Sequence, residues 1–282
     1  MPDKSLTHPD HPDHPDQIII QPKGRHEDLA FEELATLYNF GPELIHDRRV
    51  MYVRLLIKES LKYTSPVRML DIGCGNGISA NQATSAKLLR ALRAHVDELW
   101  GIEPDETIQP EHGIFTKLQH ATLENADLPE NYFELAHSFM VIEHVAEPKA
   151  FLAALFRVLK PGGSIIFMTP NAKHLVVQLA KLLHHCHMDE WVLRLVRGQQ
   201  GVDSYHYPVQ YKLNSTRRID KLALEVGFEK PQYVFTEGLG APAYFPGPLR
   251  PIHWLLRAKR TLWKNPEVLI ELTCRMTKPK IS

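Results

Sequence analysis

Three glycines at alternate positions follow an acidic residue in the segment Asp71-Ile-Gly73-Cys74-Gly75-Asn-Gly77. Glycines permit a tight turn and let a ligand approach the backbone without a Cβ in the way. The spacing differs from the G-x-G-x-x-G of dinucleotide-binding proteins, because Ile78 stands where the third glycine would be. The negative charge of Asp71 opposes a pyrophosphate but favours a cation. The segment therefore predicts a site for a cationic cofactor.

A second acidic residue, Glu103, ends the next predicted strand and is followed by Pro104. An ionised carboxylate offers two acceptor oxygens, enough to bind both hydroxyls of a ribose. In open sheets of parallel strands the ligand lies at the carboxyl ends of the strands, which is where Glu103 stands. A solvated surface glutamate is the competing interpretation.

These residues need a sheet to position them, and the chain alternates strand and helix patterns from residue 67 to residue 169. Short apolar runs predict strands at 67–71, 98–102, 115–118, 134–140 and 164–169, with helices at 78–95 and 149–159. Such alternation indicates an open, mainly parallel sheet with right-handed crossovers. Further helices are predicted at 42–63, 172–197 and 215–226, the last with Gly227 as its C-cap, and further strands at 232–236 and 268–276.

Residues 71–77 resemble the first motif of class I S-adenosylmethionine-dependent methyltransferases. The resemblance extends closely over residues 67–171, through Val141-Ile-Glu143-His144-Val145 and the turn Lys160-Pro161-Gly162-Gly163. It implies an α/β fold: a Rossmann-like seven-stranded mixed sheet, mostly parallel with the last strand antiparallel, with helices on both faces and a helical cap. It also implies S-adenosylmethionine as the cofactor. Asp71 is then expected at its ammonium group, the glycine loop around its amino-acid portion and Glu103 at its ribose.

Later segments extend the implied cofactor site. Thr122 and Leu123 stand in the family's adenine-binding turn, where Thr122 replaces the usual Asp and so weakens the adenine contact or leaves it to the backbone. Ser138 and Phe139 lie at the carboxyl end of the strand predicted at 134–140, although core packing explains Phe139 equally well. Upstream, residues 44–53 are similar to a segment of ubiquinone-biosynthesis O-methyltransferases, and this likeness implies that Arg49 approaches the cofactor.

Methyl transfer from a sulfonium is an in-line displacement, in which alignment of the reactants supplies much of the rate enhancement. A general base is needed only where the acceptor must lose a proton. His144 is the first candidate because imidazole titrates near neutral pH, and its neighbour Glu143 is the second. A structural role for His144 beneath the following helix is a competing interpretation. Tyr205 and His206 are weaker candidates on the predicted cap.

No metal site is predicted. Glu143-His144 occurs in ubiquinone-type enzymes, some of which use that neighbourhood for a divalent metal, but Met140 cannot serve as an oxygen ligand here. The run His184-His185-Cys186-His187 has no paired ligand group, and adjacent residues on a helix point in different directions.

The composition of the chain limits its possible partners and its location. The 282 residues include 33 Lys and Arg against 33 Asp and Glu, and this balance gives no reason to expect a nucleic-acid partner. Three separated cysteines indicate a reducing compartment, and neither a secretion signal nor a membrane-spanning apolar run is recognisable, so a cytoplasmic location is predicted. The predicted organisation is a disordered tail at 1–25, N-terminal helices at 26–65 and a methyltransferase domain at 66–282. That domain carries the cap at 172–212 and a basic, aromatic insertion at 237–266.

The sequence of the insertion at 237–266 gives a hint about the location of the protein and about the kind of acceptor. Between residues 249 and 264 it carries Arg257, Lys259, Arg260 and Lys264 among Trp and Leu residues, with no Asp or Glu. A basic amphipathic helix of this kind suits peripheral contact with a membrane surface or an amphiphilic acceptor. A helix that packs its Trp and Leu side on the sheet is the alternative.

The leading hypothesis is methyl transfer to a small-molecule acceptor, with a lipid-like acceptor as the finer expectation. A catalytically silent relative that binds the cofactor or a protein partner is the second, and the departure at Thr122 keeps it open. A protein or RNA methyltransferase is the third. Against it, Phe139-Met-Val-Ile stands where many amino-group methylators have an Asn/Asp-Pro-Pro-aromatic tetrapeptide. The sequence determines neither the acceptor atom nor the oligomeric state.

Overall fold

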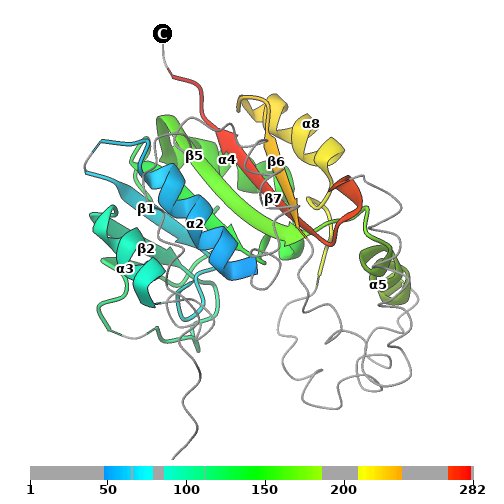
Figure 1. Cartoon of the computed structure of the whole chain (residues 1–282), viewed down its shortest axis with the longest axis horizontal. Coiled ribbons are helices and arrows are strands. Elements are labelled where there is room, and N and C mark those ends of the chain that lie inside the picture. The colour runs from blue at the N-terminus through cyan, green and yellow to red at the C-terminus, as the bar shows by residue number, and fades with distance from the viewer. Residues whose placement is uncertain are drawn as a thin grey trace, which may run out of the picture.

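A seven-stranded sheet forms the centre of the computed structural model (Figure 1). The structure describes residues 48–64, 66–78, 86–110, 112–185, 209–236 and 266–280. The strands are β1 (Arg68–Ile72), β2 (Glu98–Ile102), β3 (Lys117–Gln119), β4 (Phe133–Phe139), β5 (Leu159–Pro170), β6 (Gln232–Thr236) and β7 (Glu271–Thr277). Their order in the sheet is β3-β2-β1-β4-β5-β7-β6, and the pairs that β7 makes with β5 and β6 are antiparallel, whereas the other pairs are parallel. The predicted mixed sheet with an antiparallel last strand is confirmed.

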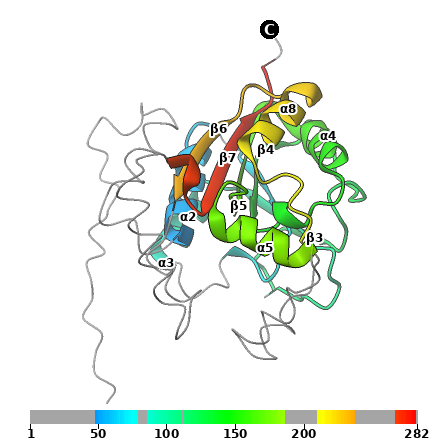
Figure 2. The same ribbon diagram turned by 90° about the vertical axis from the view of Figure 1, so that its right-hand side faces the viewer.

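Helices cover both faces of this sheet (Figure 2). The described α-helices are α2 (Arg48–Ser60), α3 (Ala86–Ala94), α4 (Pro148–Val158), α5 (Leu175–His185) and α8 (Thr216–Val226), with short 3₁₀ helices η2 (Ile142–His144) and η5 (Pro266–Val268). Apolar residues of α2 and α3 pack with Met69 and Leu135 on one face, while those of α4 and α8 pack with Leu70 and Ala136 on the other. Successive residues of a strand point to opposite faces, so β1 and β4 serve both cores.

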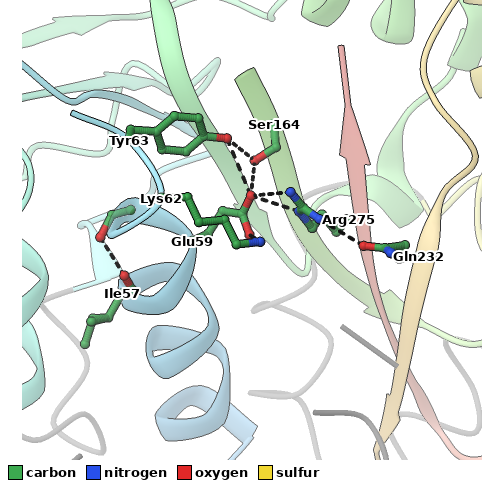
Figure 3. Close-up of polar contacts among 8 residues, drawn as sticks. Ile57, Glu59, Lys62, Tyr63, Ser164, Gln232 and Arg275 are labelled. Atoms are coloured by element: carbon green, nitrogen blue, oxygen red, sulfur yellow. Dashed lines mark hydrogen bonds and ion pairs between the residues drawn. The ribbon is translucent and has the colours of Figure 1, made fainter. Parts of the chain in front are cut away.

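A buried polar cluster fixes the end of α2 to the sheet (Figure 3). Glu59 is 2% exposed, and its Oε1 accepts hydrogen bonds from Ser164 Oγ at 2.9 Å and from Arg275 Nε at 2.8 Å. Lys62 Nζ donates to the other carboxylate oxygen at 2.7 Å, and Tyr63 OH lies 2.8 Å from Ser164 Oγ. The buried charge of Glu59 is therefore matched by cations and hydroxyls from the segment that follows α2, from β5 and from β7.

Several boundaries differ from the sequence predictions. The chain enters β5 at Leu159, and the turn predicted at 160–163 is a register irregularity inside this strand, with Gly162 at φ 79°. The strand predicted from residue 268 begins at Glu271, because Pro266–Val268 forms η5. Gly227 ends α8 in the left-handed conformation at φ 112°, with its N–H bonded to Ala223 O, which confirms the predicted C-cap.

Some predicted segments lie outside the described residues. These are the tail and first helix before residue 48, the cap between 186 and 208 with Tyr205 and His206, and the insertion between 237 and 265. Residues 79–85, the start of the helix predicted at 78–95, also lie outside them. Within the described ranges, no helix combines the length and the apolar character needed to cross a membrane.

Candidate active site

The turn after β1 is the structural centre of the site. Gly73 N–H donates to Ile102 O at 2.8 Å, and Gly77 N–H closes the turn on Cys74 O at 2.7 Å. Gly73 adopts φ 65°, and a Cβ at this position would lie 2.6 Å from Val141 Cγ2. Only glycine therefore fits between the β1 turn and the segment that follows β4.

A cavity of about 310 Å³ opens beside this turn, within the range of small-molecule sites. Its lining residues come from α2, β1, the glycine turn and β4: Arg49, Asp71, Gly73, Cys74, Asn76, Gly77, Ile78, His137 and Phe139. The structure thus brings together six residues that the sequence assigned to the cofactor. Their individual roles remain predictions.

Two carboxyl groups give the site its negative character. Asp71 is 4% exposed, and burial, together with the charge of Glu103, raises the pKa of Asp71 to about 8. Glu103 Oε2 accepts a hydrogen bond from Gly75 N–H at 2.9 Å, and its Oε1 accepts one from Asp105 N–H at 3.1 Å. Glu103 therefore holds the glycine turn in place, a role that its sequence position did not suggest. Neither Gly75 nor Glu103 lines the cavity itself; both belong to the polar framework that holds the turn beside it.

The fit of a cationic cofactor follows from this arrangement. An uncompensated carboxylate is costly in a buried site, and a bound cation removes that cost by stabilising the ionised form. The open backbone at Gly73 and the carboxyls of Asp71 and Glu103 thus suit a ligand with an ammonium group and a sulfonium. These residues fit S-adenosylmethionine.

Besides Gly75 and Glu103, four further predicted cofactor residues do not line this cavity. Pro104 and Thr122 are exposed, and Leu123 is buried in the core on the α4 side of the sheet. Ser138 is completely buried, and its Oγ donates to Ile72 O at 3.0 Å across β1 and β4. Alternation along β4 explains the last placement, because Ser138 points away from the face that carries His137 and Phe139.

One wall of the cavity is aromatic. Phe139 packs against Tyr52 of α2 with ring centroids 5.0 Å apart, and the guanidinium of Arg49 lies 5.9 Å from the Phe139 centroid. Tyr52 OH lies within hydrogen-bond distance of two backbone carbonyl oxygens and can donate to either, Ser138 O at 2.9 Å or Ile166 O at 2.8 Å. Tyr52 therefore anchors the start of α2, and Arg49 with it, over the carboxyl ends of β4 and β5.

The predicted base candidates lie in η2, beyond Phe139. Glu143 is 5% exposed, its Oε2 accepts a hydrogen bond from Thr169 Oγ1 at 3.0 Å, and burial raises its pKa to about 7. Its backbone carbonyl accepts N–H bonds from Gln210 and Tyr211 at 2.7 and 3.0 Å. His144 is half-buried. Neither base candidate lines the cavity. The described residues contain no group of three or more His, Cys, Asp or Glu that could hold a metal ion.

Three lining residues, Asn76, Ile78 and His137, were not assigned to the site from the sequence. Asn76 and Ile78 flank the last glycine of the loop, so their position in the motif could have indicated them. His137 stands in a strand whose sequence pattern predicts only burial in the core. The signal that could have found it is a titratable residue two positions before the end of a ligand-facing strand.

The family of the chain follows from its likeness to known proteins. Residues 44–230 match the sequence model of a family described as a methyltransferase domain. The chain belongs to this methyltransferase family. The predicted family is thereby confirmed, and the assignment supports S-adenosylmethionine as the cofactor of this methyltransferase domain.

Individual relatives agree with the assignment. The ubiquinone biosynthesis O-methyltransferase of Dinoroseobacter shibae is 31% identical over 156 residues, which cover 52% of this chain and 62% of that protein. The protein of the same name from Ruegeria pomeroyi is 34% identical over 106 residues, covering 37% of this chain and 42% of its own. The methyltransferase chain thus spans less than two thirds of the length of the curated relatives it matches.

Solved structures share the fold at low identity. An S-adenosylmethionine-dependent methyltransferase from Archaeoglobus fulgidus has a TM-score of 0.51 at 16% identity, covering 84% of this chain and 97% of its own. Phosphoethanolamine N-methyltransferase 2 of Haemonchus contortus, solved with S-adenosylmethionine, has a TM-score of 0.50 at 15% identity, with 89% and 58% covered. Both confirm the fold of the methyltransferase domain.

Proposed function

We propose that this methyltransferase transfers the methyl group of S-adenosylmethionine to a hydroxyl oxygen of a small, amphiphilic acceptor. Glu143 is the observation that carries the proposal. It is a buried carboxyl with a pKa of about 7, at the sheet edge that also carries the cofactor cavity. A general base works best when its pKa lies near the operating pH, and a hydroxyl acceptor must lose a proton. The O-methyltransferase names of the relatives support the same acceptor atom.

The residues have distinct roles in this proposal. Asp71 and Glu103 bind the cofactor, which when bound supplies a methyl group already activated by its sulfonium. Glu143 accepts the acceptor's proton, and Thr169 orients its carboxylate through the 3.0 Å hydrogen bond. His144, the first candidate from the sequence, is the alternative base on the same short helix. Alignment over the Phe139 wall supplies the remaining contribution to the rate.

An amphiphilic acceptor is supported by the described part of the predicted cap at 172–212. The side chains of Leu175, Leu179 and Leu182 on α5 are 55%, 52% and 58% exposed. They follow the i, i+4, i+7 spacing that places side chains on one side of a helix. A row of apolar side chains next to the carboxyl edge of the sheet suits an acceptor with an apolar body.

The test begins with calorimetric titration of S-adenosylmethionine into wild type, Gly73→Ala and Glu103→Ala. Alanine at Gly73 brings a Cβ against Val141, so binding should be lost, and Glu103→Ala should weaken binding because the turn loses its anchor at Gly75. Gly113→Ala is the matched control, since Gly113 also has a positive φ, 88°, but a Cβ there meets nothing within 4 Å. Its affinity should equal that of wild type.

A screen of hydroxyl acceptors with and without apolar chains follows, with the product identified by mass spectrometry. O-methylated product formed preferentially from amphiphilic acceptors supports the proposal. N- or S-methylated product, or cofactor binding without turnover of any hydroxyl acceptor, contradicts the assigned acceptor atom while leaving the cofactor site intact.

A further inference from the structure

His137 occupies a position in the cofactor cavity that the proposed reaction does not use. It lies in register with Asp71 in the parallel pair β1–β4, so the two side chains project from the same face of the sheet. The His137 side chain is 1% exposed and lines the cavity. Its Nδ1 lies 3.5 Å from Asp71 Oδ1, longer than a hydrogen bond. Neither ring nitrogen has a hydrogen-bond partner among the described residues.

Unpartnered buried polar atoms are rare and indicate a missing partner or a functional role. Tyr52, whose ring packs edge-on at 6.1 Å, cannot satisfy the imidazole, because its hydroxyl is bonded to backbone groups of Ser138 and Ile166. Burial lowers the pKa of His137 to about 3, so the ring is neutral and carries one N–H donor. The Asp71 carboxylate, with Oδ1 3.5 Å from Nδ1, is placed to accept that hydrogen after a small shift.

We propose that His137 is a positioning residue that holds the ionised Asp71 carboxylate, through an Nδ1–H hydrogen bond, for the amino group of the cofactor. A neutral donor suits this role because it stabilises the carboxylate and leaves its negative charge available to the cofactor's ammonium. A lysine or arginine at position 137 would compete with that ammonium and repel the sulfonium. Hydrogen bonds in ligand-free sites are often long and shorten in the complex. The inference rests on the cofactor assignment and holds whichever acceptor is methylated.

Among the groups around the cavity, Asp71 is the one that we expect to lose a proton when the cofactor binds. The titratable and charged groups around it are His137 from β4, Tyr52 and Arg49 from α2, Cys74 from the glycine turn and Glu103 after β2. Burial raises the pKa of Tyr52 and of Cys74, which keeps both neutral near pH 7. Binding a cation at Asp71 should therefore release the Asp71 proton.

The experiment compares wild type, His137→Leu and His137→Asn by calorimetric titration between pH 6 and 9, in buffers of different ionisation enthalpy. Two ligands are used: S-adenosylhomocysteine, which has the amino-acid portion, and methylthioadenosine, which lacks it. The amide of His137→Asn keeps a donor near the position of Nδ1, whereas His137→Leu removes it. For wild type we expect affinity for S-adenosylhomocysteine to rise roughly tenfold per pH unit until Asp71 is ionised, with proton release on binding.

His137→Leu should weaken S-adenosylhomocysteine at least tenfold at pH 7 and move the break in the pH profile upward by about one unit. It should leave methylthioadenosine within about threefold of wild type, and His137→Asn should restore both the affinity and the break. Equal losses for both ligands, or for both variants, would mean that His137 only fills space and would overturn the proposal. Wild-type affinity and an unmoved break in His137→Leu would overturn it as well.

If His137→Leu does not fold, the wild-type protein still gives an answer. Nitrogen-15 NMR of the imidazole ring should show the Nδ1–H tautomer in the S-adenosylhomocysteine complex. An Nε2–H tautomer there would contradict the inference.

Discussion

At the scale of single residues, two buried carboxyls at one sheet edge have different surroundings. Asp71 has His137 beside it, at a distance longer than a hydrogen bond, whereas Glu143 accepts a hydrogen bond from Thr169. Burial raises the pKa of both, because removing water penalises the charged form. The ionised carboxylate, which burial disfavours in the free protein, can bind a cation or accept a proton from an acceptor. The binding role proposed for Asp71 and the base role proposed for Glu143 therefore rest on the same physical effect.

The first prediction concerns stability as a function of pH. The pKa of Asp71 is about 8 in the folded protein against an ordinary value of 3.8, so the stability contribution of this group is complete only below about pH 3.8 and is lost progressively as pH rises through about 8. Between pH 6.5 and 8 the ligand-free protein should lose stability, by up to about 1.4 kcal/mol per pH unit for this group. Urea denaturation of Asp71→Asn should give a clearly shallower slope. An identical slope in the variant would contradict the raised pKa.

Glu143 leads to a prediction about rate. Glu143→Gln keeps an acceptor for Thr169 but cannot take a proton, so kcat for a hydroxyl acceptor should fall about 10²- to 10⁴-fold. The wild-type kcat should rise with pH through about 7, and this limb should vanish in the variant. Cofactor affinity should not change, since Glu143 does not line the cavity. His144→Gln is the matched variant: if it loses the limb while Glu143→Gln keeps it, the base is His144.

At the scale of helices and strands, local sequence patterns predicted most of the strand positions. The strands at 98–102 and 232–236 are found as predicted, because short apolar runs between turn residues leave little freedom. The β5 start and the β7 start were misplaced, since a register irregularity and a 3₁₀ turn depend on neighbouring strands. The same limit applies to the site. Asp71 and the glycines could be identified from their spacing, whereas His137 matters only through its pairing with β1.

The Glu59 cluster gives a prediction at this scale. Removing one partner of a buried ion pair leaves the other charge uncompensated, so Glu59→Ala should destabilise the protein by about 3–5 kcal/mol in urea denaturation. Lys62→Ala is the matched control, because its side chain is 43% exposed and Arg275 still neutralises the glutamate. It should cost about 1 kcal/mol or less. Similar losses in both variants would show that Arg275 and Ser164 do not depend on Glu59.

At the scale of the whole molecule, the topology sends two long segments away from the same edge. The cap follows the end of β5, and the insertion leaves the end of β6 and returns at the start of β7, where Thr236 is in register with Glu271. Because β7 is antiparallel, its start lies at the carboxyl edge of the parallel strands, which is also the edge of the cofactor cavity. Both ends of the insertion are therefore attached at the edge of the sheet that carries the cofactor cavity.

The last prediction follows from that placement. If the insertion lies on a membrane, each of its basic residues should contribute about 1 kcal/mol on an anionic surface. Glutamine at Arg257, Lys259, Arg260 and Lys264 should then lower the partition onto anionic vesicles at least about tenfold at low salt. The control variant carries glutamine at four basic residues that are exposed on and after α8, namely Arg217, Arg218, Lys221 and Lys230. It changes the net charge by the same amount as the insertion variant. Its partition should stay within about threefold of wild type in the same sedimentation assay.

Comparing the two sets of substitutions separates a docking surface from net charge. A loss confined to the insertion variant, seen on anionic vesicles at low salt and absent at high salt or on zwitterionic vesicles, identifies the insertion as an electrostatic contact with the membrane surface. Equal losses in both variants would indicate attraction by overall charge alone. Absence of vesicle binding in wild type at low salt would favour the alternative in which the Trp and Leu side packs on the sheet, and an acceptor would then have to reach the cavity from solution.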